Sequence, residues 1–285
     1  MKKVVLSVVA ALALSAAPAF AADMPAKAAK VAPAAAPSPW DVAFGTAFTT
    51  DYELRGVSQS NHRPAVQGYF ELDYTATDWL KLYAGVWGSS LWTGFANAEF
   101  DITGGARLTF GNFGLDVGYI QYEYPGGGVS FTGNWGEAYA KPSYKFADWL
   151  TVGGVFETAF NNFNNQVAPA PWVGNAGHYY VSGNAVVTLP WKPVPDVTIS
   201  INPEVGYEWY SSGVTTNLGF VPDTYWDVGL DFNYKAITLD LRYWDINVKP
   251  SATGNQCGFI PAGTNFCGSR FVATLKFDTT LSALK

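Results

Sequence analysis

Charged residues at alternate positions of apolar segments are the part of this sequence whose chemistry most needs explaining. In the segment near 98–110, Glu99, Asp101 and Arg107 share one parity, whereas Phe100 and Ile102 share the other. Because the side chains of a strand alternate between its two faces, one face of this segment is charged and the other is apolar. Charged groups stay ionised only where water or partner charges reach them. The pattern therefore predicts strands with one wet face and one apolar face.

The same alternation predicts a set of charged residues that line a wet interior, with acids in excess. They are Glu71, Asp73, Lys81, Glu99, Asp101, Arg107, Glu204, Glu208, Asp227, Asp231, Asp240 and Arg242. An acidic excess in a pore favours cations over anions. The alternative is an interior of salt bridges that plugs and stabilises a barrel. Eight strands hold a filled interior and about sixteen leave a channel, and the intermediate size expected here favours the open pore.

Asp51, Glu53 and Arg55 share a strand parity just before a long loop, so they are candidates for the mouth of a pore. They would either narrow the outer mouth or brace the loop by pairing Arg55 with Glu53 or Asp51. The second role is the favoured interpretation.

Cys257 and Cys267 are the two cysteines of the chain, and both lie in the last long loop. An exported pair of this kind is expected to form a disulfide. A metal pair is the alternative, but zinc prefers four ligands and no histidine or further cysteine lies nearby. We expect no metal site and no cofactor.

An enzyme would need a nucleophile and a base. The two histidines, His62 and His178, fall in or beside long loops and are interpreted as surface residues. Ser182 shares a strand face with His178, but the spacing is too long for a direct hydrogen bond. The sequence therefore favours a protein without enzymatic activity.

The elements that must position these residues are about twelve strands, each about ten residues long with alternating hydrophobicity. We expect them near 41–54, 65–75, 79–89, 98–110, 113–124, 135–146, 149–160, 178–189, 197–210, 225–234, 237–246 and 269–277. Their connections alternate between short and long, as in an up-and-down barrel of the outer membrane. A soluble β-sandwich is the alternative.

The tryptophans separate these two alternatives. Trp40, Trp79, Trp149 and Trp191 lie at strand ends with short turns, and Trp87, Trp92, Trp135, Trp172, Trp209, Trp226 and Trp244 lie near long loops. Two aromatic girdles are typical of a membrane barrel. The expected fold class is therefore all-β, a transmembrane antiparallel up-and-down barrel of about twelve strands.

Composition and the first residues agree with an exported protein. A net charge of −6 argues against nucleic-acid binding. Lys2 and Lys3, an apolar stretch and the Ala-x-Ala site predict a signal peptide over 1–21, cleaved after Ala21. We expect residues 22–39, rich in Ala, Pro and Lys, to form a flexible periplasmic segment. Residues 40–285 form the predicted barrel.

Several motifs resemble the TorF family of porins. The segments are Asp51-Tyr-Glu-Leu-Arg-Gly-Val-Ser-Gln59 followed by Pro64-Ala-Val-Gln-Gly68, then Tyr83-Ala-Gly-Val-Trp-Gly-Ser89, Glu99 with Asp101, and Gly118-Tyr-Ile-Gln-Tyr-Glu-Tyr-Pro125. The resemblance implies a proteobacterial outer-membrane barrel with a role in transport. The chain departs from many such barrels at its end, because Phe277 is followed by Asp278 to Lys285.

These observations together predict a Gram-negative outer-membrane porin for small hydrophilic solutes, mildly selective for cations and surrounded by outer-membrane lipid. A structural or surface-interaction barrel with a plugged lumen is the second hypothesis.

Overall fold

The structure is a computed structural model that describes residues 38–92, 96–125, 134–159, 177–212, 219–258 and 260–284. The predicted signal peptide and residues 22–37 of the predicted periplasmic segment lie outside these ranges, as does Trp172.

Fourteen strands are formed by the described residues, and twelve of them build the barrel wall. The wall strands are β1 (Trp40–Thr49), β4 (Ala65–Thr77), β5 (Leu80–Ser90), β6 (Ala98–Phe110), β7 (Phe113–Glu123), β8 (Trp135–Ala147), β9 (Leu150–Ala159), β10 (His178–Thr188), β11 (Val197–Tyr210), β12 (Asp223–Tyr234), β13 (Ile237–Ile246) and β14 (Arg270–Thr280). The remaining strands, β2 (Glu53–Leu54) and β3 (Val57–Ser58), pair only with each other. Two short 3₁₀ helices, η1 (Ile260–Ala262) and η2 (Ser282–Leu284), complete the described elements.

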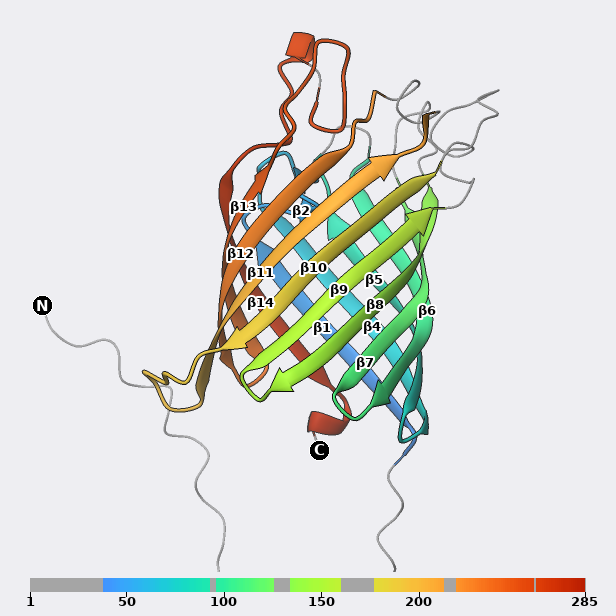
Figure 1. Cartoon of the computed structure of the whole chain (residues 1–285), viewed down its shortest axis with the longest axis vertical. Helices are drawn as coiled ribbons and strands as arrows, with labels where there is room; N and C mark the ends of the chain where they lie inside the picture. Colours follow the sequence, from blue (N-terminus) through green and yellow to red (C-terminus); the bar gives the residue numbers. More distant parts are fainter. Residues whose placement is uncertain are drawn as a thin grey trace, which may run out of the picture. The chain divides into compact units, whose positions relative to one another are not determined.

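Each wall strand pairs antiparallel with its neighbours in chain order, and β1 closes the barrel by pairing with both β4 and β14. The closing register places Ala43 opposite Thr280 and Thr49 opposite Thr274. Closure satisfies the backbone hydrogen bonds of every wall strand and leaves no open edge. The predicted antiparallel barrel of twelve strands is confirmed (Figure 1).

No helix among the described residues is long and apolar enough to cross a bilayer.

Large apolar side chains cover the outer face of the wall. Phe271 is 83% exposed, and Phe48, Phe70, Ile102 and Leu275 are each at least half exposed. A barrel in water would bury such side chains, because contiguous apolar surface in water is unfavourable. The face suits lipid, and the predicted alternation of an apolar outer face with a polar inner face follows the strand pleat.

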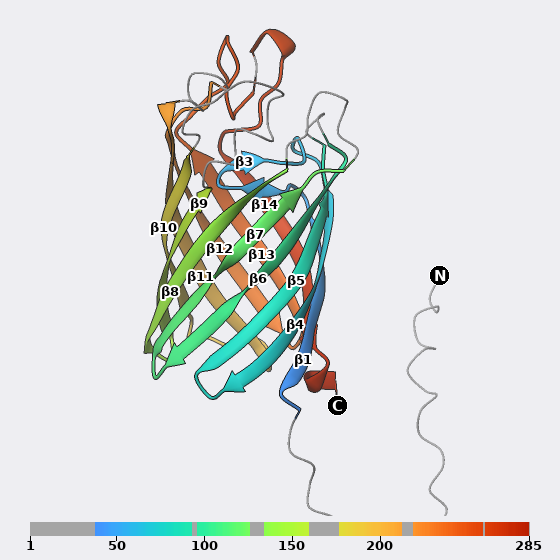
Figure 2. The same cartoon turned by 90° about the vertical axis from the view of Figure 1, so that its right-hand side faces the viewer.

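The two ends of the barrel differ, as the connection lengths predicted. Short turns, the start of β1 and helix η2 lie at one end, and the described parts of the long connections lie at the other (Figures 1 and 2). At the short-turn end Trp40, Trp79, Trp149 and Trp191 are between 46% and 64% exposed. These rings lie where headgroups would be.

The second predicted girdle is only partly correct. Trp92 and Trp226 are exposed at the long-connection end. Trp135 is buried against Tyr122, and Trp87 and Trp244 line internal cavities. The position of these rings along the strand was predicted correctly, but their parity directs them into the lumen instead of toward lipid.

The first long connection, residues 50–64, folds into the barrel. Strands β2 and β3 form a hairpin that lies within the outline of the wall near the long-connection end in both views (Figures 1 and 2). The predicted first strand, 41–54, is therefore too long, because β1 ends at Thr49 and the chain then turns inward. We call residues 50–64 the inner hairpin.

Candidate functional site

The tip of the inner hairpin is a two-residue turn made by Arg55 and Gly56. Leu54 pairs with Val57, and the two turn residues have φ values of 51° and 80°. Positive φ at both positions is typical of the type I′ turns that close tight hairpins. A Cβ atom at Gly56 would lie 2.8 Å from the Cβ of Tyr225, so the site excludes larger residues. The Arg-Gly pair thus places a guanidinium at the innermost point of the hairpin.

Arg55 contacts the part of the wall that lies opposite β1 and β4 in the strand order. Its Nη1 donates to Glu208 Oε1 of β11 at 2.9 Å, and its Nη2 donates to Glu137 Oε2 of β8 at 2.8 Å. The same Nη2 also bonds Glu157 of β9. The guanidinium carbon lies 4.3 Å from the ring centre of Tyr180, within the range of a cation–π contact. The inner hairpin is therefore fixed across the lumen at its tip.

His178 completes this group, which we call the Arg55 cluster: Arg55, Glu137, Glu157, His178 and Glu208. The two ring nitrogens of His178 face different carboxylates, with Nδ1 2.9 Å from Glu137 Oε1 and Nε2 against Glu208 Oε1. Because both ring nitrogens face carboxylate oxygens, the surroundings of the ring favour the imidazolium form. His178 is 2% exposed, so its interpretation as a surface residue was wrong.

The Arg55 cluster is close to electroneutral. Arg55, His178 and Lys141, whose Nζ lies 3.0 Å from Glu157 Oε1, supply three positive charges against three glutamates. Balanced charges and hydrogen bonds on most of the oxygens are what a buried ionic group requires. The cluster anchors the hairpin to three strands of the wall. Ser182 lies four residues farther along β10, about 13 Å from His178 at 3.3 Å per residue.

Asp51 and Glu53 lie at the base of the hairpin and pair with Arg270 of β14, not with Arg55. Arg270 Nη1 is 2.8 Å from Glu53 Oε1 and 3.4 Å from Asp51 Oδ2. The favoured interpretation, that Arg55 pairs within its own strand, is therefore wrong. The error arose because Asp51 to Arg55 were treated as one continuous strand.

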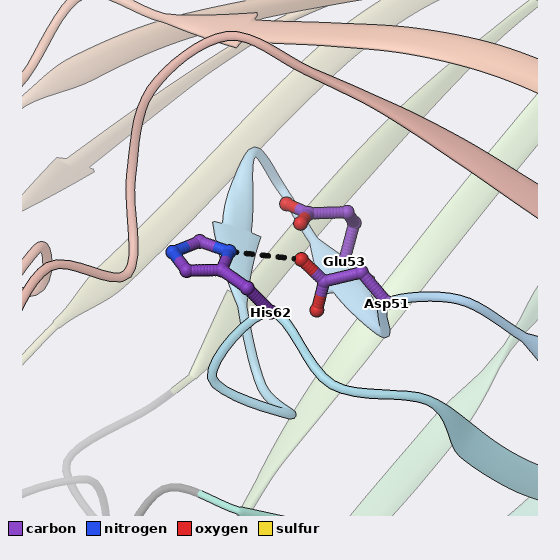
Figure 3. Close-up of side chains that lie close together, drawn as sticks. All are labelled: Asp51, Glu53 and His62. Carbon is purple, nitrogen blue, oxygen red and sulfur yellow. Dashed lines mark hydrogen bonds and ion pairs between the residues drawn. The ribbon is translucent and has the colours of Figure 1, made fainter.

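Local hydrogen bonds favour the ionised form of the Asp51 carboxyl group. Burial raises the pKa of this carboxyl, but hydrogen bonds from Ser58, Ser60 and His62 outweigh burial and hold the pKa below its usual value. Both hydroxyls donate to Asp51 Oδ1 at 2.6 Å. His62 Nδ1 lies 3.0 Å from the other oxygen, Oδ2 (Figure 3). Asp51 is the carboxylate that organises the base of the hairpin.

The loop that follows β13 covers the hairpin from outside, and its disulfide is present as predicted. Cys257 and Cys267 are bonded, with their Cα atoms 5.0 Å apart. Both are buried against Val57, Tyr180 and other residues of one apolar cluster. The Ser58 amide donates to the Phe266 carbonyl at 2.8 Å, so this disulfide loop holds one leg of the hairpin.

Four of the residues predicted to line a pore form one ionic group on β4, β5 and β6. Arg107 donates to Glu71 through both Nη1 and Nη2, at 2.6 and 2.8 Å, and lies 3.3 Å from Asp73. Lys81 is 3.3 Å from Asp73. Asp116 of β7 also lies 3.3 Å from Arg107, so this inward-facing group holds three acids against two bases and keeps one negative charge.

A second group lies on β12, β13 and β14. Arg242 pairs with Asp227 and lies 3.3 Å from Asp240, which Lys276 also contacts at 3.1 Å. Glu208 belongs to the Arg55 cluster. Along the sequence, Arg242 is the arginine nearest to the predicted pore-lining acids of β11 and β12. The inner hairpin supplies a second arginine, which sequence proximity could not reveal.

Four of the predicted pore-lining acids lie in no ion pair among the residues that the structure describes: Glu99, Asp101, Glu204 and Asp231. Neutral donors contact three of them. Glu204 accepts from the hydroxyls of Tyr180 and Tyr225, both at 2.7 Å. Asp231 accepts from Asn202 at 2.6 Å, and Glu99 accepts from Tyr52 at 3.3 Å. Asp223 of β12 is a further buried acid in no ion pair among the described residues, and it accepts from Gln256 at 2.9 Å.

Cavities adjoin the inner hairpin on both of its sides. One of about 340 Å³ is lined by Arg55, Lys141 and Glu204, and one of about 270 Å³ by Glu204, Asp240 and Lys276. These two share Tyr52, Trp87 and Trp244 in their linings. A third of about 410 Å³ opens beside Asp51, His62 and Arg270 toward the long connections. The hairpin thus lies between cavities whose linings include charged residues.

The sequence matches the model of one protein family over residues 33–275, most of its length. That family is described as a bacterial protein of unknown function, Gcw_chp. The chain belongs to the Gcw_chp family. Its description carries no TorF name, so the resemblance to TorF porins stays a prediction. None of the curated proteins compared with the chain matches it.

Several solved structures are similar to this chain at low identity. One, from a study of the in-meso crystallization of membrane proteins, is 8% identical with a TM-score of 0.50, and the match covers 85% of this chain and 84% of the other. The KdgM porin is 11% identical, with a TM-score of 0.45 over 83% and 98% of the two chains. The NanC porin is 9% identical, with a TM-score of 0.47 over 84% and 98%. At such identities the likeness concerns the fold alone.

Proposed function

We propose that this protein is an outer-membrane channel for small hydrophilic solutes, narrowed by its inner hairpin and mildly selective for cations. The observation that carries the proposal is the set of cavities beside the hairpin whose linings include charged residues, inside a closed barrel with an apolar outer face. Charged side chains in the lining of these cavities supply the polar contacts that hydrophilic solutes need.

The preference for cations follows from the charges that the wall does not compensate. The Arg55 cluster and the group around Arg107 are balanced or nearly so, whereas Glu99, Asp101, Glu204 and Asp231 have no basic partner among the described residues. Glu204 lines both cavities on the short-turn side of the hairpin. Carboxylates in this position attract cations and repel anions.

The outer membrane is the proposed location for three reasons. The barrel has an apolar outer face, the chain carries a predicted signal peptide, and the disulfide fits an oxidising compartment. The resemblance to TorF porins points the same way. Partners in this proposal are the surrounding lipid and small solutes, and no catalytic step is assigned to the chain.

A structural barrel with a closed lumen is the second candidate, and the Arg55 cluster favours it. A guanidinium bonded to three strands of the opposite wall is a strong obstacle to the movement of the hairpin. The two candidates differ in one measurable property, which is ion flow.

Planar bilayers distinguish the two. Purified protein should give discrete conductance steps, and a salt gradient across the bilayer should give a reversal potential of the sign expected for cation preference. Because salt screens charges over about 8 Å at physiological ionic strength, the preference should weaken at high salt. Anion preference would contradict the acidic lumen, and the absence of any conductance would favour the structural barrel.

A further inference from the structure

We propose that the two cavities that meet at Glu204 form one binding site for a small organic cation with an alkylated ammonium group. The cavities of about 340 and 270 Å³ share five residues in their linings: Tyr52, Glu53, Trp87, Glu204 and Trp244. We call Tyr52, Trp87, Glu204 and Trp244 the Glu204 pocket. The proposal rests on the channel function, because it names the class of solute that the lumen binds.

The Glu204 pocket is assembled from separate parts of the barrel. Trp87 lies on β5, Glu204 on β11 and Trp244 on β13, and no two of these strands are neighbours in the wall. Tyr52 comes from the inner hairpin, and its ring centre lies 5.4 Å from that of Trp87. The pocket therefore depends on the hairpin, which adds a ring inside the lumen.

Glu204 supplies a negative charge that is fixed in position and has no basic partner among the described residues. Its Oε1 accepts from the hydroxyls of Tyr180 and Tyr225, both at 2.7 Å. These two bonds orient the carboxylate, and the described residues donate no hydrogen bond to its Oε2. An oriented carboxylate with one oxygen left to accept, in the lining of two cavities, is ready to bind a cation from outside.

The bases that line these cavities are already engaged by other acids. Their ion pairs are Arg55 and Lys141 with Glu157, Arg242 with Asp227, and Lys276 with Asp240. Glu53, the fifth shared residue, is paired with Arg270 from outside both linings. Asp101 also lines the larger cavity and has no basic partner among the described residues. The combined lining therefore keeps an excess of negative charge.

The three rings determine the kind of cation. A cation over the face of Trp or Tyr is attracted by the ring quadrupole, and aromatic groups of this kind recognise quaternary ammonium ions. Arg242 lies 5.9 Å from the ring centre of Trp244, at the limit of such a contact. No cation among the described residues lies over the ring of Tyr52 or Trp87. An ammonium group with methyl substituents has no N–H to satisfy, so rings and one carboxylate are sufficient for it.

A divalent metal ion and an anion fit this pocket less well. Mg²⁺ and Ca²⁺ take six or more oxygen ligands, whereas Glu204 offers one oxygen that has no donor. Anions are repelled by the excess of acids. The larger cavity, of about 340 Å³, is at the lower end of the range of about 300–1,000 Å³ that is typical of small-molecule sites. A small organic cation therefore matches both the lining and the volume.

Calorimetry of choline binding to the tag-free, folded barrel in detergent tests the proposal. Choline carries a trimethylammonium group, and 3,3-dimethylbutan-1-ol is its neutral isostere, with a carbon in place of the nitrogen. We expect saturable binding of one choline per chain. The neutral isostere should bind about tenfold more weakly or worse, because it lacks the charge that the rings and Glu204 attract.

Two variants and their matched controls assign the binding to the pocket. Glu204→Gln should weaken choline binding about tenfold or more, and its amide oxygen can still accept from Tyr180 and Tyr225. Asp231→Asn removes another inward-facing acid that lines neither cavity and should bind choline as the parent does. Trp87→Leu should weaken binding, whereas Trp92→Leu, at an exposed ring outside both linings, should not. A heat-induced gel shift shows that each variant is folded.

The outcomes separate the pocket from the channel. The absence of saturable binding, equal affinity for the neutral isostere, or parent affinity in folded Glu204→Gln would each overturn the proposal. Ion conductance without choline tests the channel by itself. A barrel that conducts but does not bind choline would refute the pocket alone, and a barrel that binds choline but does not conduct would refute the channel and the transport role of the pocket.

Choline added to potassium chloride gives a second readout in planar bilayers. It should reduce the potassium conductance of the parent more than that of Glu204→Gln, because bound choline occupies the lumen. An equal reduction in both proteins would contradict binding at Glu204.

Discussion

Arg55→Met is the substitution that tests most directly whether the inner hairpin controls the lumen. Methionine keeps an unbranched side chain of similar length but has no charge and no donors. Arg55 donates to Glu137, Glu157 and Glu208 in the native protein. The variant leaves these carboxylates with His178 and Lys141 as their positive neighbours.

The magnitude follows from the burial of the pairs. Removing one partner of a buried ion pair costs about 3–5 kcal/mol, because the other charge stays buried without compensation. At about 1.4 kcal/mol per factor of ten, this cost shifts the equilibrium between the fixed and the displaced hairpin by roughly 100- to 5,000-fold. Displacement moves Arg55 and Gly56 away from Tyr180 and Tyr225 and widens the passage.

Single-channel recording in planar bilayers measures the result. We expect Arg55→Met to open more often or to a larger conductance than the parent protein, and Arg55→Lys to fall between them. Lysine keeps the charge but has one nitrogen, whereas the arginine uses Nη1 and Nη2 on different strands. Arg63→Met is the matched control, because Arg63 lies in the same connection, is exposed and stacks on Trp92.

Folding must be established separately, by the shift in gel mobility that heating causes in folded barrels. If folded Arg55→Met had the parent conductance, the hairpin would not limit ion flow, and the argument from the Arg55 cluster would be refuted.

Three further predictions concern the wall, the loop and the selectivity. Leu230→Arg places a charge on the lipid face at an expected cost of about 2–4 kcal/mol and should block assembly. Asp231→Arg places the charge on the inward face and should assemble. Equal yields of folded protein for the two variants, measured by gel shift, would contradict the assignment of faces. Cys257→Ser should leave the barrel folded but make residues 247–268 more sensitive to protease, since the disulfide contributes roughly 3 kcal/mol at most, and thiol titration of the oxidised parent should find no free thiol. Glu204→Gln combined with Asp231→Asn should reduce the reversal potential under a salt gradient, and an unchanged value would assign the selectivity to other residues.

The wall of the barrel was predictable because strand parity is a local property. Each segment carries its own alternation, and β6, β11 and β13 begin and end at the predicted residues. Turn residues such as Gly111 mark the short connections, where a positive φ of 59° is required. The disulfide was predictable as well, since its two cysteines are ten residues apart in one loop.

The contents of the lumen were not predictable in this way. Asp51 to Arg55 alternate like a strand, and parity alone does not distinguish a continued β1 from a hairpin that turns inward. The adjacent Gly56 was the available signal, because Arg-Gly at φ values of 51° and 80° closes a tight turn. His178 has the sequence context of a loop boundary, yet it is buried between Glu137 and Glu208.

The sequence by itself determined the all-β class, the approximate strand boundaries, the apolar face of each strand and the Cys257–Cys267 bond. These depend on periodicity and on short separations along the chain. Only the tertiary structure decided which charges meet inside the barrel. Arg55 is separated from Glu208 by 153 residues and reaches it only because the closed sheet brings opposite strands within the length of a hairpin. Which charges compensate one another in the lumen depends on their distances in the folded barrel. The order of residues along the chain does not give those distances.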